Sequence, residues 1–291
     1  MSENEDLHRV LARPGLRILD LRPTGDFVAG HLAGAVHHAL TGPVDPVLLE
    51  AELPSIFLPP REIPLLVVAV DPLQARAAAE HLEGRGRAPV TGRVMTAADL
   101  EGLPPEMVAS GAERGHLWSP PAWLADHEGL LPPPAAGPVL DLACGSGRAA
   151  VWLAERGYRV TGLDWQSEAL DMGRRLAASR GVTCDFRTAD LRREEAVPAG
   201  PWSVLLNFRY LDRTLLASFP RLVRPTGVAF LRTFREAPGY EGHPRPRHRL
   251  APWELTGAFA RGEWEILAHE QGFDLDGRPA AGIVARRRSP D

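Results

Sequence analysis

The chain has 291 residues, 44% hydrophobic and 24% charged, so it is long enough for two domains that each bury a core. Its formal net charge of -4 gives no general attraction to nucleic acid or to an anionic membrane. The 2 cysteines are too few for a disulfide framework or a cysteine-rich zinc site. No run reaches the roughly 18 apolar residues that span a bilayer, and the acidic residues 1–6 do not resemble a signal peptide. We therefore expect a soluble, cytoplasmic protein without a metal.

The first half of the chain contains one clear strand–loop–helix unit. Residues 64–70 form a continuous apolar run of strand length, which is typical of a buried parallel strand. Helix-forming residues follow over 73–82, and a shorter strand is predicted at 16–21. This pattern predicts an α/β domain.

Proline-rich segments divide the chain. Clusters at 119–121 and 131–134 break regular structure and enclose a predicted amphipathic helix at 122–130. We expect three parts, which are a first domain of residues 1–108, a connector of residues 109–135 and a second domain of residues 136–291.

Strands alternate with helices through the second domain. The predicted strands are 138–142, 158–164, 182–187, 203–206 and 227–233, and the predicted helices are 147–156 and 167–179. Such alternation implies a mostly parallel sheet that is covered on both faces. Apolar runs at 264–268 and 281–285 flank the turn-rich Asp274-Leu275-Asp276-Gly277, so we expect a final antiparallel pair and seven strands in all.

A glycine-rich loop joins the first strand and helix of this domain, with the sequence Asp141-Leu142-Ala143-Cys144-Gly145-Ser146-Gly147-Arg148. Its glycines allow a sharp turn and let a ligand approach without meeting a Cβ atom. Positions 149 and 150 are alanine, so the third glycine of a dinucleotide site is absent, and no Gly-Lys-Ser/Thr follows. A two-glycine loop is a weak signal by itself.

Two carboxylates after the loop strengthen that signal. Asp164 ends the second strand, where it can accept hydrogen bonds from both hydroxyls of a ribose. Asp190 follows the third strand and can accept from the amino group of adenine, with Leu191 as apolar cover. Each carboxylate alone could simply cap a loop. In this order they describe an adenosine site without a phosphate site.

The segment Val139–Arg148 closely resembles the glycine-rich motif of class I S-adenosylmethionine-dependent methyltransferases, and the resemblance covers roughly residues 117–291. It implies a Rossmann-like domain with S-adenosylmethionine as its cofactor. The cofactor-binding residues that it implies are Asp141, Ala143, Cys144, Gly145, Gly147, Arg148, Asp164, Trp165, Asp190, Leu191 and Asn207.

The resemblance also gives several of these residues a role. Gly145 and Gly147 would pass under the methionine part of the cofactor, and Trp165 would stack beside the adenine. Asp141 has two readings, because it could contact the ligand or order its own loop. Cys144 fits a small packing residue better than a nucleophile, since no basic residue adjoins it.

Within the superfamily, the chain is most similar to the tellurite-resistance-type methyltransferases. The similarity lies in Trp118-Ser119-Pro120, in Phe208–Arg213 and in Leu222–Gly227.

The acceptor side is expected in the loop after the fourth strand and in the long polar segment 235–248, which could form a lid. Arg209 and Tyr210 are candidate substrate contacts in the first, and His248 in the second. Arg209 could instead pair with a carboxylate, and the loop histidine could be exposed to solvent. Departure of the thioether needs no protonation, so we assign no catalytic residue.

The first domain resembles a rhodanese domain over roughly residues 5–106, through Ile18–Pro23 and Asp26–His37. In that family a strand leads into a loop whose cysteine takes up sulfur as a persulfide. The matching strand, residues 64–68, puts Ala69 at the position of that cysteine.

The first domain contains no cysteine at all, so we expect it to be catalytically silent. Asp20, Arg22 and His31 are then residues that hold the fold. The remaining roles are a docking surface, a homodimer contact or a cover for the methyltransferase pocket.

These observations predict a methyltransferase that acts on a small-molecule acceptor, with a thiol or chalcogen compound as one candidate. The composition argues against a membrane or a nucleic acid as partner. The alternative is a non-catalytic sensor that binds S-adenosylmethionine and signals through the rhodanese-like domain.

Replacing Asp164 with alanine removes the predicted ribose contact, so we expect Asp164→Ala to abolish binding of S-adenosylmethionine in calorimetric titration. Asp20→Ala is the matched control, because it should destabilise the first domain and leave that binding intact. Normal cofactor affinity in Asp164→Ala would show that the ribose lies elsewhere.

Overall fold

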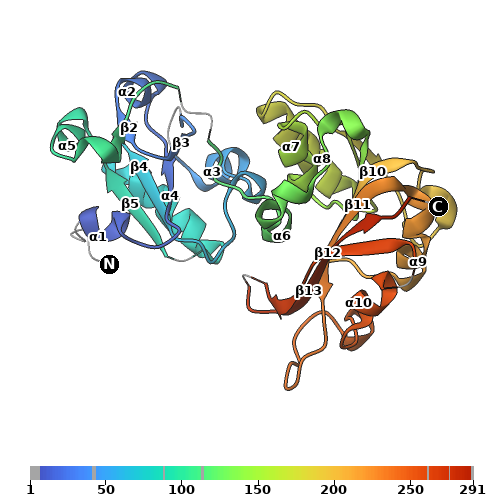
Figure 1. The fold of residues 1–291 in the computed structure, drawn as a ribbon. Helices are drawn as coiled ribbons and strands as arrows, with labels where there is room; N and C mark the ends of the chain where they lie inside the picture. The colour runs from blue at the N-terminus through green and yellow to red at the C-terminus, as the bar shows by residue number, and fades with distance from the viewer. Residues whose placement is uncertain are drawn as a thin grey trace. The chain divides into compact units, whose positions relative to one another are not determined.

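The chain forms two compact units, residues 1–119 and residues 120–291, in a computed structural model (Figure 1). The structure describes residues 7–40, 44–87, 89–112, 115–260, 262–274 and 276–289. The acidic residues 1–6 and Leu275 of the predicted turn lie outside the described residues.

The first unit is built on a four-stranded parallel sheet with the order β3-β1-β4-β5. These strands are β1 (Arg17–Asp20), β3 (Ala35–His37), β4 (Leu65–Ala69) and β5 (Val90–Val94). The continuous apolar run of the sequence is β4, which is buried along its whole length because it lies between β1 and β5 and is covered on both faces.

Helices cover both faces of this sheet. They are α1 (Leu7–Leu11), α2 (Thr24–Ala29), α3 (Pro46–Glu52), α4 (Pro72–Gly84) and α5 (Ala97–Glu101), with 3-10 turns at Ser55–Phe57 and Pro105–Met107 and a short antiparallel pair of β2 (His31–Leu32) and β6 (Val108–Ala109). Alternate residues of β1 and β4 face opposite ways. One face packs against α3 and α4, and the other against α1, α2 and α5.

The polar residues expected to hold this domain together are buried. Asp20 and Arg22 form an ion pair with 2.7 Å between Oδ2 and Nη2, and Arg22 also donates to the carbonyl of Gly30. His31 is fully buried and stacks on Phe27 with 3.8 Å between the ring centroids. Removing one partner of such a buried pair leaves an uncompensated charge, which fits a structural role.

The second unit contains the seven-stranded sheet, with the order β12-β13-β11-β10-β7-β8-β9. Its strands are β7 (Val139–Leu142), β8 (Val160–Asp164), β9 (Asp185–Thr188), β10 (Trp202–Phe208), β11 (Val223–Phe234), β12 (Trp264–Phe273) and β13 (Pro279–Arg287). β9, β8, β7, β10 and β11 pair in parallel, whereas β13 is antiparallel to both neighbours. The mostly parallel sheet and the final antiparallel pair are therefore confirmed.

Helices also cover both faces of this sheet, as Figure 1 shows. They are α6 (Ala122–Asp126), α7 (Arg148–Ala154), α8 (Ser167–Ser179), α9 (Arg213–Leu222) and α10 (Glu254–Phe259), with 3-10 turns at Glu128–Leu130, Pro134–Ala136, Glu194–Ala196 and Pro246–His248. α9 and α10 cover one face, and α7 and α8 pack on the other. In the described part of the chain, no helix has the length and apolar character needed to cross a bilayer.

The helix predicted over 122–130 is shorter than expected. It ends at Asp126, and a separate 3-10 turn follows. Only Trp123 and Leu124 are buried, and the indole of Trp123 donates to the carbonyl of Ile283 at 3.3 Å. The residues after Asp126 bury no side chain that would extend the helix.

Phe186 of β9 fills a space that three glycines leave open. A Cβ atom would lie 2.4 Å from the ring at Gly147, 2.8 Å at Gly162 and 3.1 Å at Gly173. These glycines belong to the loop before α7, to β8 and to α8. One aromatic ring thus sets the distance between the glycine loop and the sheet.

Adding a methyl group at Gly162 places a Cβ atom 2.8 Å from Phe186 and 3.0 Å from the Sγ of Cys144. We expect Gly162→Ala to lower the free energy of unfolding by about 1–3 kcal/mol through overpacking. Gly257→Ala in α10 meets open space and is the control, with a gain of up to about 1 kcal/mol. Equal melting temperatures for wild type and Gly162→Ala would contradict the close packing of Phe186 against these three glycines.

Candidate functional site

The glycine loop between β7 and α7 carries three positive φ angles, at Ala143 (55°), Gly145 (53°) and Gly147 (69°). Gly147 is the N-cap of α7. The space beside Gly147 is filled by Phe186, whereas a Cβ atom at Gly145 would meet nothing within 4 Å. Gly145 is therefore the glycine that leaves room for a ligand, and Gly147 is the one that the fold requires.

Asp141 lies at the base of this loop with 2% of its surface exposed. Its Oδ2 is buried and has no hydrogen-bond partner among the described residues. Burial raises the pKa of Asp141 to about 8, the charge of Asp164 adds to the rise, and the N–H of Ala150 opposes it. A buried carboxyl oxygen without a partner is costly unless a ligand completes it, and a positively charged group would suit it best.

Asp164 ends β8 and joins two loops by its carboxylate. Its Oδ2 accepts from the N–H of Gly145 at 2.8 Å, and its Oδ1 accepts from the N–H of Gln166 at 2.9 Å. Each oxygen keeps a second lone pair. The next residue, Trp165, is 70% exposed, an unusual state for an indole and one that leaves its ring face open to a ligand.

Asp190 and Leu191, which the sequence predicts as adenine contacts, both make contacts within the protein. The carboxylate of Asp190 accepts from Nε and Nη2 of Arg192, at 2.8 and 2.7 Å. These bonds hold the pKa of Asp190 at about 2. Leu191 is 7% exposed and belongs to the core that also contains α9 and α10.

Three further residues of the loop contact the protein itself. Ala143 packs against the core beneath β7. The N–H of Cys144 donates to the carbonyl of Leu163 at 2.9 Å, and burial raises the pKa of its thiol, so the thiol stays protonated and unreactive. Arg148 begins α7, and burial lowers the pKa of its guanidinium.

Asn207 and Tyr210 lie at the end of β10, the strand next to β7. Asn207 is 4% exposed and pairs in the sheet with Leu142 of β7. Tyr210 is half-buried, and burial raises the pKa of its phenol, as does first of all the charge of Asp212. The phenol of Tyr210 is therefore a proton donor rather than a base.

Two arginines that follow β10, Arg209 and Arg213, are both paired with carboxylates. Arg209 has a φ of 59° and bonds Asp276 at 2.9 Å and Asp274 at 3.1 Å. Arg213 bonds both oxygens of Glu254, at 2.6 and 2.8 Å. The carboxylate-paired reading of Arg209 is therefore the one that the structure supports.

The long segment after β11 is organised by an arginine that the sequence analysis did not select. Arg249 is 5% exposed and donates to the carbonyls of Pro244, Tyr240 and Gly242. His248 lies outside this arrangement, exposed, and its Nε2 accepts from Arg247 at 3.0 Å. One buried arginine that donates to backbone carbonyls of the same loop has no sequence pattern by which it could be recognised.

Thr233 is a second residue that the sequence analysis missed. It lies in β11, 4% exposed, and its Oγ1 is buried without a hydrogen-bond partner among the described residues. Thr233 pairs with Ala281 of β13 near the carboxyl end of β11. Its signal is a hydroxyl within the otherwise apolar and basic run Val228–Phe234.

No cluster of His, Cys, Asp or Glu suitable for a metal ion occurs within the described ranges.

Comparison with known proteins identifies a methyltransferase domain within the second unit. The sequence model of the family described as "Methyltransferase domain" matches residues 139–227. A ubiquinone biosynthesis O-methyltransferase of Pseudomonas aeruginosa is 32% identical over 40% of this chain and 50% of its own length. The second unit therefore contains a methyltransferase domain, matched at residues 139–227.

Two other similarities were found, one to a protein sequence over the whole chain and one to a solved structure over part of it. The uncharacterized protein UNK4.09 of Schizosaccharomyces pombe is 24% identical over 99% of this chain and 98% of its own length. TehB from Haemophilus influenzae is 18% identical and superposes with a TM-score of 0.49 over 57% of this chain and 61% of that one. The chain spans about half the length of the ubiquinone O-methyltransferase that it matches.

The residues of the methyltransferase domain fit S-adenosylmethionine. The cofactor carries two positive groups, an ammonium and a sulfonium, and its sulfonium methyl is the group that is transferred. Asp141 offers a buried carboxyl oxygen without a partner, Asp164 offers free lone pairs at the carboxyl edge of the sheet, and Trp165 offers an open ring face. Gly145 leaves the space through which the cofactor would pass.

The pKa of Asp141 gives a pH-dependent prediction for the protein without cofactor. In the unfolded chain this carboxyl ionises near its ordinary pKa of about 4, whereas in the folded chain it stays protonated to about 8. Unfolding therefore releases a proton between these values, and Asp141 lowers the free energy of unfolding as the pH rises from about 4 to about 8.

We expect Asp141→Asn to remove this decline, because the amide does not titrate. The difference in unfolding free energy between variant and wild type should rise over this range by at most about 1.4 kcal/mol per pH unit, measured by urea denaturation. The exposed Glu241→Gln is the control and should follow the wild-type profile. Parallel profiles for Asp141→Asn and wild type would refute the raised pKa.

Proposed function

We propose that this chain transfers the methyl group of S-adenosylmethionine to a small-molecule acceptor. The observation that carries the proposal is the order of three parallel strands, in which β7 with its glycine loop lies between β8, which ends at Asp164, and β10, which leads to Tyr210. This order supports an acceptor that lies near the cofactor at the carboxyl edge of the sheet. An acceptor that packs against Tyr210 would then meet the transferred methyl group.

The class of acceptor follows from which charged side chains near Tyr210 are not already paired. Arg209 and Arg213 are engaged with Asp274, Asp276 and Glu254, so they offer little attraction to a polyanion. Tyr210 is a hydrogen-bond donor, because its pKa is raised. A polarisable thiol or another chalcogen nucleophile suits such a site. Near its own pKa such a nucleophile is already partly deprotonated, so it needs little help from a general base. The motifs Trp118-Ser119-Pro120 and Phe208–Arg213 support the tellurite-resistance-type subgroup.

The first unit is, in this proposal, a rhodanese-like domain without sulfurtransferase activity. Its parallel sheet and the buried Asp20–Arg22 pair support the assignment. β4 includes Ala69, which is fully buried, so Val70 is the first residue of the loop where a nucleophile would stand. Neither residue can form a persulfide, and Asp71 caps α4 by accepting from Leu73.

The partners proposed with this function are the small acceptor and a second copy of the chain or another protein that binds the rhodanese-like domain. The charge of -4 disfavours nucleic acid and an anionic membrane surface. The free cysteines Cys144 and Cys184 support a cytoplasmic location.

The test begins with calorimetric titration of S-adenosylmethionine and S-adenosylhomocysteine, with NADH as the control. We expect micromolar binding of the first two and no binding of NADH. Incubation with thiols, chalcogen oxyanions and small amines should then give a methylated product by mass spectrometry, and Tyr210→Phe should change the KM for the acceptor more than the cofactor affinity. Cofactor binding without any product would favour the sensor, and absence of binding would remove both functions.

A further inference from the structure

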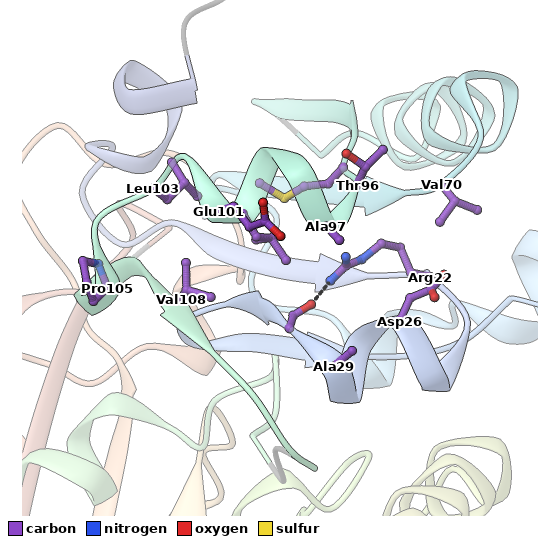
Figure 2. A pocket seen from close by; sticks show the side chains of 13 residues that line it. Arg22, Asp26, Ala29, Val70, Thr96, Ala97, Glu101, Leu103, Pro105 and Val108 are labelled. Carbon is purple, nitrogen blue, oxygen red and sulfur yellow. Dashed lines mark hydrogen bonds between the residues drawn. The ribbon is translucent and has the colours of Figure 1, made fainter.

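The first unit contains a cavity of about 560 Å³ (Figure 2). It lies at the carboxyl ends of three parallel strands, because Arg22 follows β1, Val70 follows β4 and Met95 follows β5. Small ligands of α/β proteins bind at this edge of a parallel sheet. The volume lies within the range of about 300–1,000 Å³ that is usual for small-molecule sites.

Most of the cavity wall is apolar. The apolar side chains that line it include Val70, Met95, Leu100, Leu103, Pro105 and Val108. Val70 is 44% exposed, so part of its side chain is accessible to a ligand. These walls fit the hydrocarbon part of a ligand.

The one cationic side chain in the wall is already neutralised. Arg22 donates from Nε and Nη2 to both oxygens of Asp20, and from Nη2 to the carbonyl of Gly30, a bond drawn in Figure 2. The Asp20–Arg22 pair therefore contributes no net charge to the cavity.

Two carboxylates in the wall have no such balance. Asp26 comes from α2 and Glu101 from α5, and neither side chain makes an ion pair or hydrogen bond with any described residue. Asp99 is nearby on α5, but its carboxylate accepts from Thr96 and lies in the field of Arg93. The cavity thus carries an excess of negative charge over apolar walls.

We propose that this cavity binds a small organic cation with an apolar body, of which an alkylammonium ion is the simplest example. The hydrocarbon part lies against Val70, Met95 and Leu100, and the cationic head is attracted by the negative charges of Asp26 and Glu101. An anion is rejected, because it would meet two uncompensated negative charges and a guanidinium that is already paired.

The test compares three ligands of the same length by calorimetry and by NMR chemical-shift changes on the full chain. These are hexylammonium, 1-hexanol and hexanoate. We expect millimolar binding of hexylammonium, weaker binding of 1-hexanol and the weakest binding of hexanoate. Hexanoate binding as tightly as hexylammonium would overturn the proposal, as would absence of hexylammonium binding.

Two carboxylate variants locate the charge. Asp26→Asn and Glu101→Gln should each weaken hexylammonium binding about threefold and leave 1-hexanol binding unchanged, which is the effect of one partly exposed ion pair. Glu62→Gln is the matched control, because Glu62 is exposed, lies before β4 at the opposite end of the strand and should change neither ligand.

A filling variant locates the hydrocarbon. Val70→Trp should remove binding of both hexylammonium and 1-hexanol while the melting temperature and circular dichroism spectrum stay as in wild type, since Val70 is exposed. It also separates this cavity from the cofactor residues, which belong to the other unit, because titration with S-adenosylmethionine should be unaffected. Hexylammonium binding that survives both Val70→Trp and the carboxylate variants would place the cation elsewhere and refute the proposal.

Discussion

The carboxylate of Asp164 is the point on which the methyltransferase site depends. By accepting from Gly145 and Gln166, it ties the glycine loop to the loop after β8 at one edge of the sheet. Its charge also raises the pKa of Asp141 below the loop and of Tyr210 across from it. Since charge in a buried setting is costly when unbalanced, the site is prepared for a ligand that brings positive charge.

The sequence was sufficient for the features that follow from periodicity and from glycine. The buried strand β4 is a continuous apolar run, β7 and β8 follow from the alternation of strands with helices, and α8 has the predicted bounds Ser167–Ser179. The two glycines of the loop were recognised together, but only the structure separates their roles. Gly147 leaves room for the ring of Phe186, which belongs to β9. Such a contact between distant segments cannot be predicted from local sequence.

Side-chain partners from distant segments were the part that could not be predicted. Arg209 is a candidate substrate contact in the sequence, yet its partner Asp276 comes from a segment near the end of the chain. The pairing of Asp190 with Arg192 is the opposite case. The two residues are only two positions apart, so the sequence could suggest this local contact. Thr233 was missed because its buried hydroxyl is noticeable only once its neighbours are known.

The carboxyl edges of the two sheets share one electrostatic character. In many α/β proteins this edge attracts anions through helix N-termini and basic residues. Here the glycine loop before α7 donates to the carboxylate of Asp164, and in the first unit the wall arginine is neutralised by Asp20 while Asp26 and Glu101 stay unpaired. Both edges therefore disfavour phosphates and other anions. A sulfonium cofactor at one edge and an organic cation at the other are two consequences of the same distribution of charge.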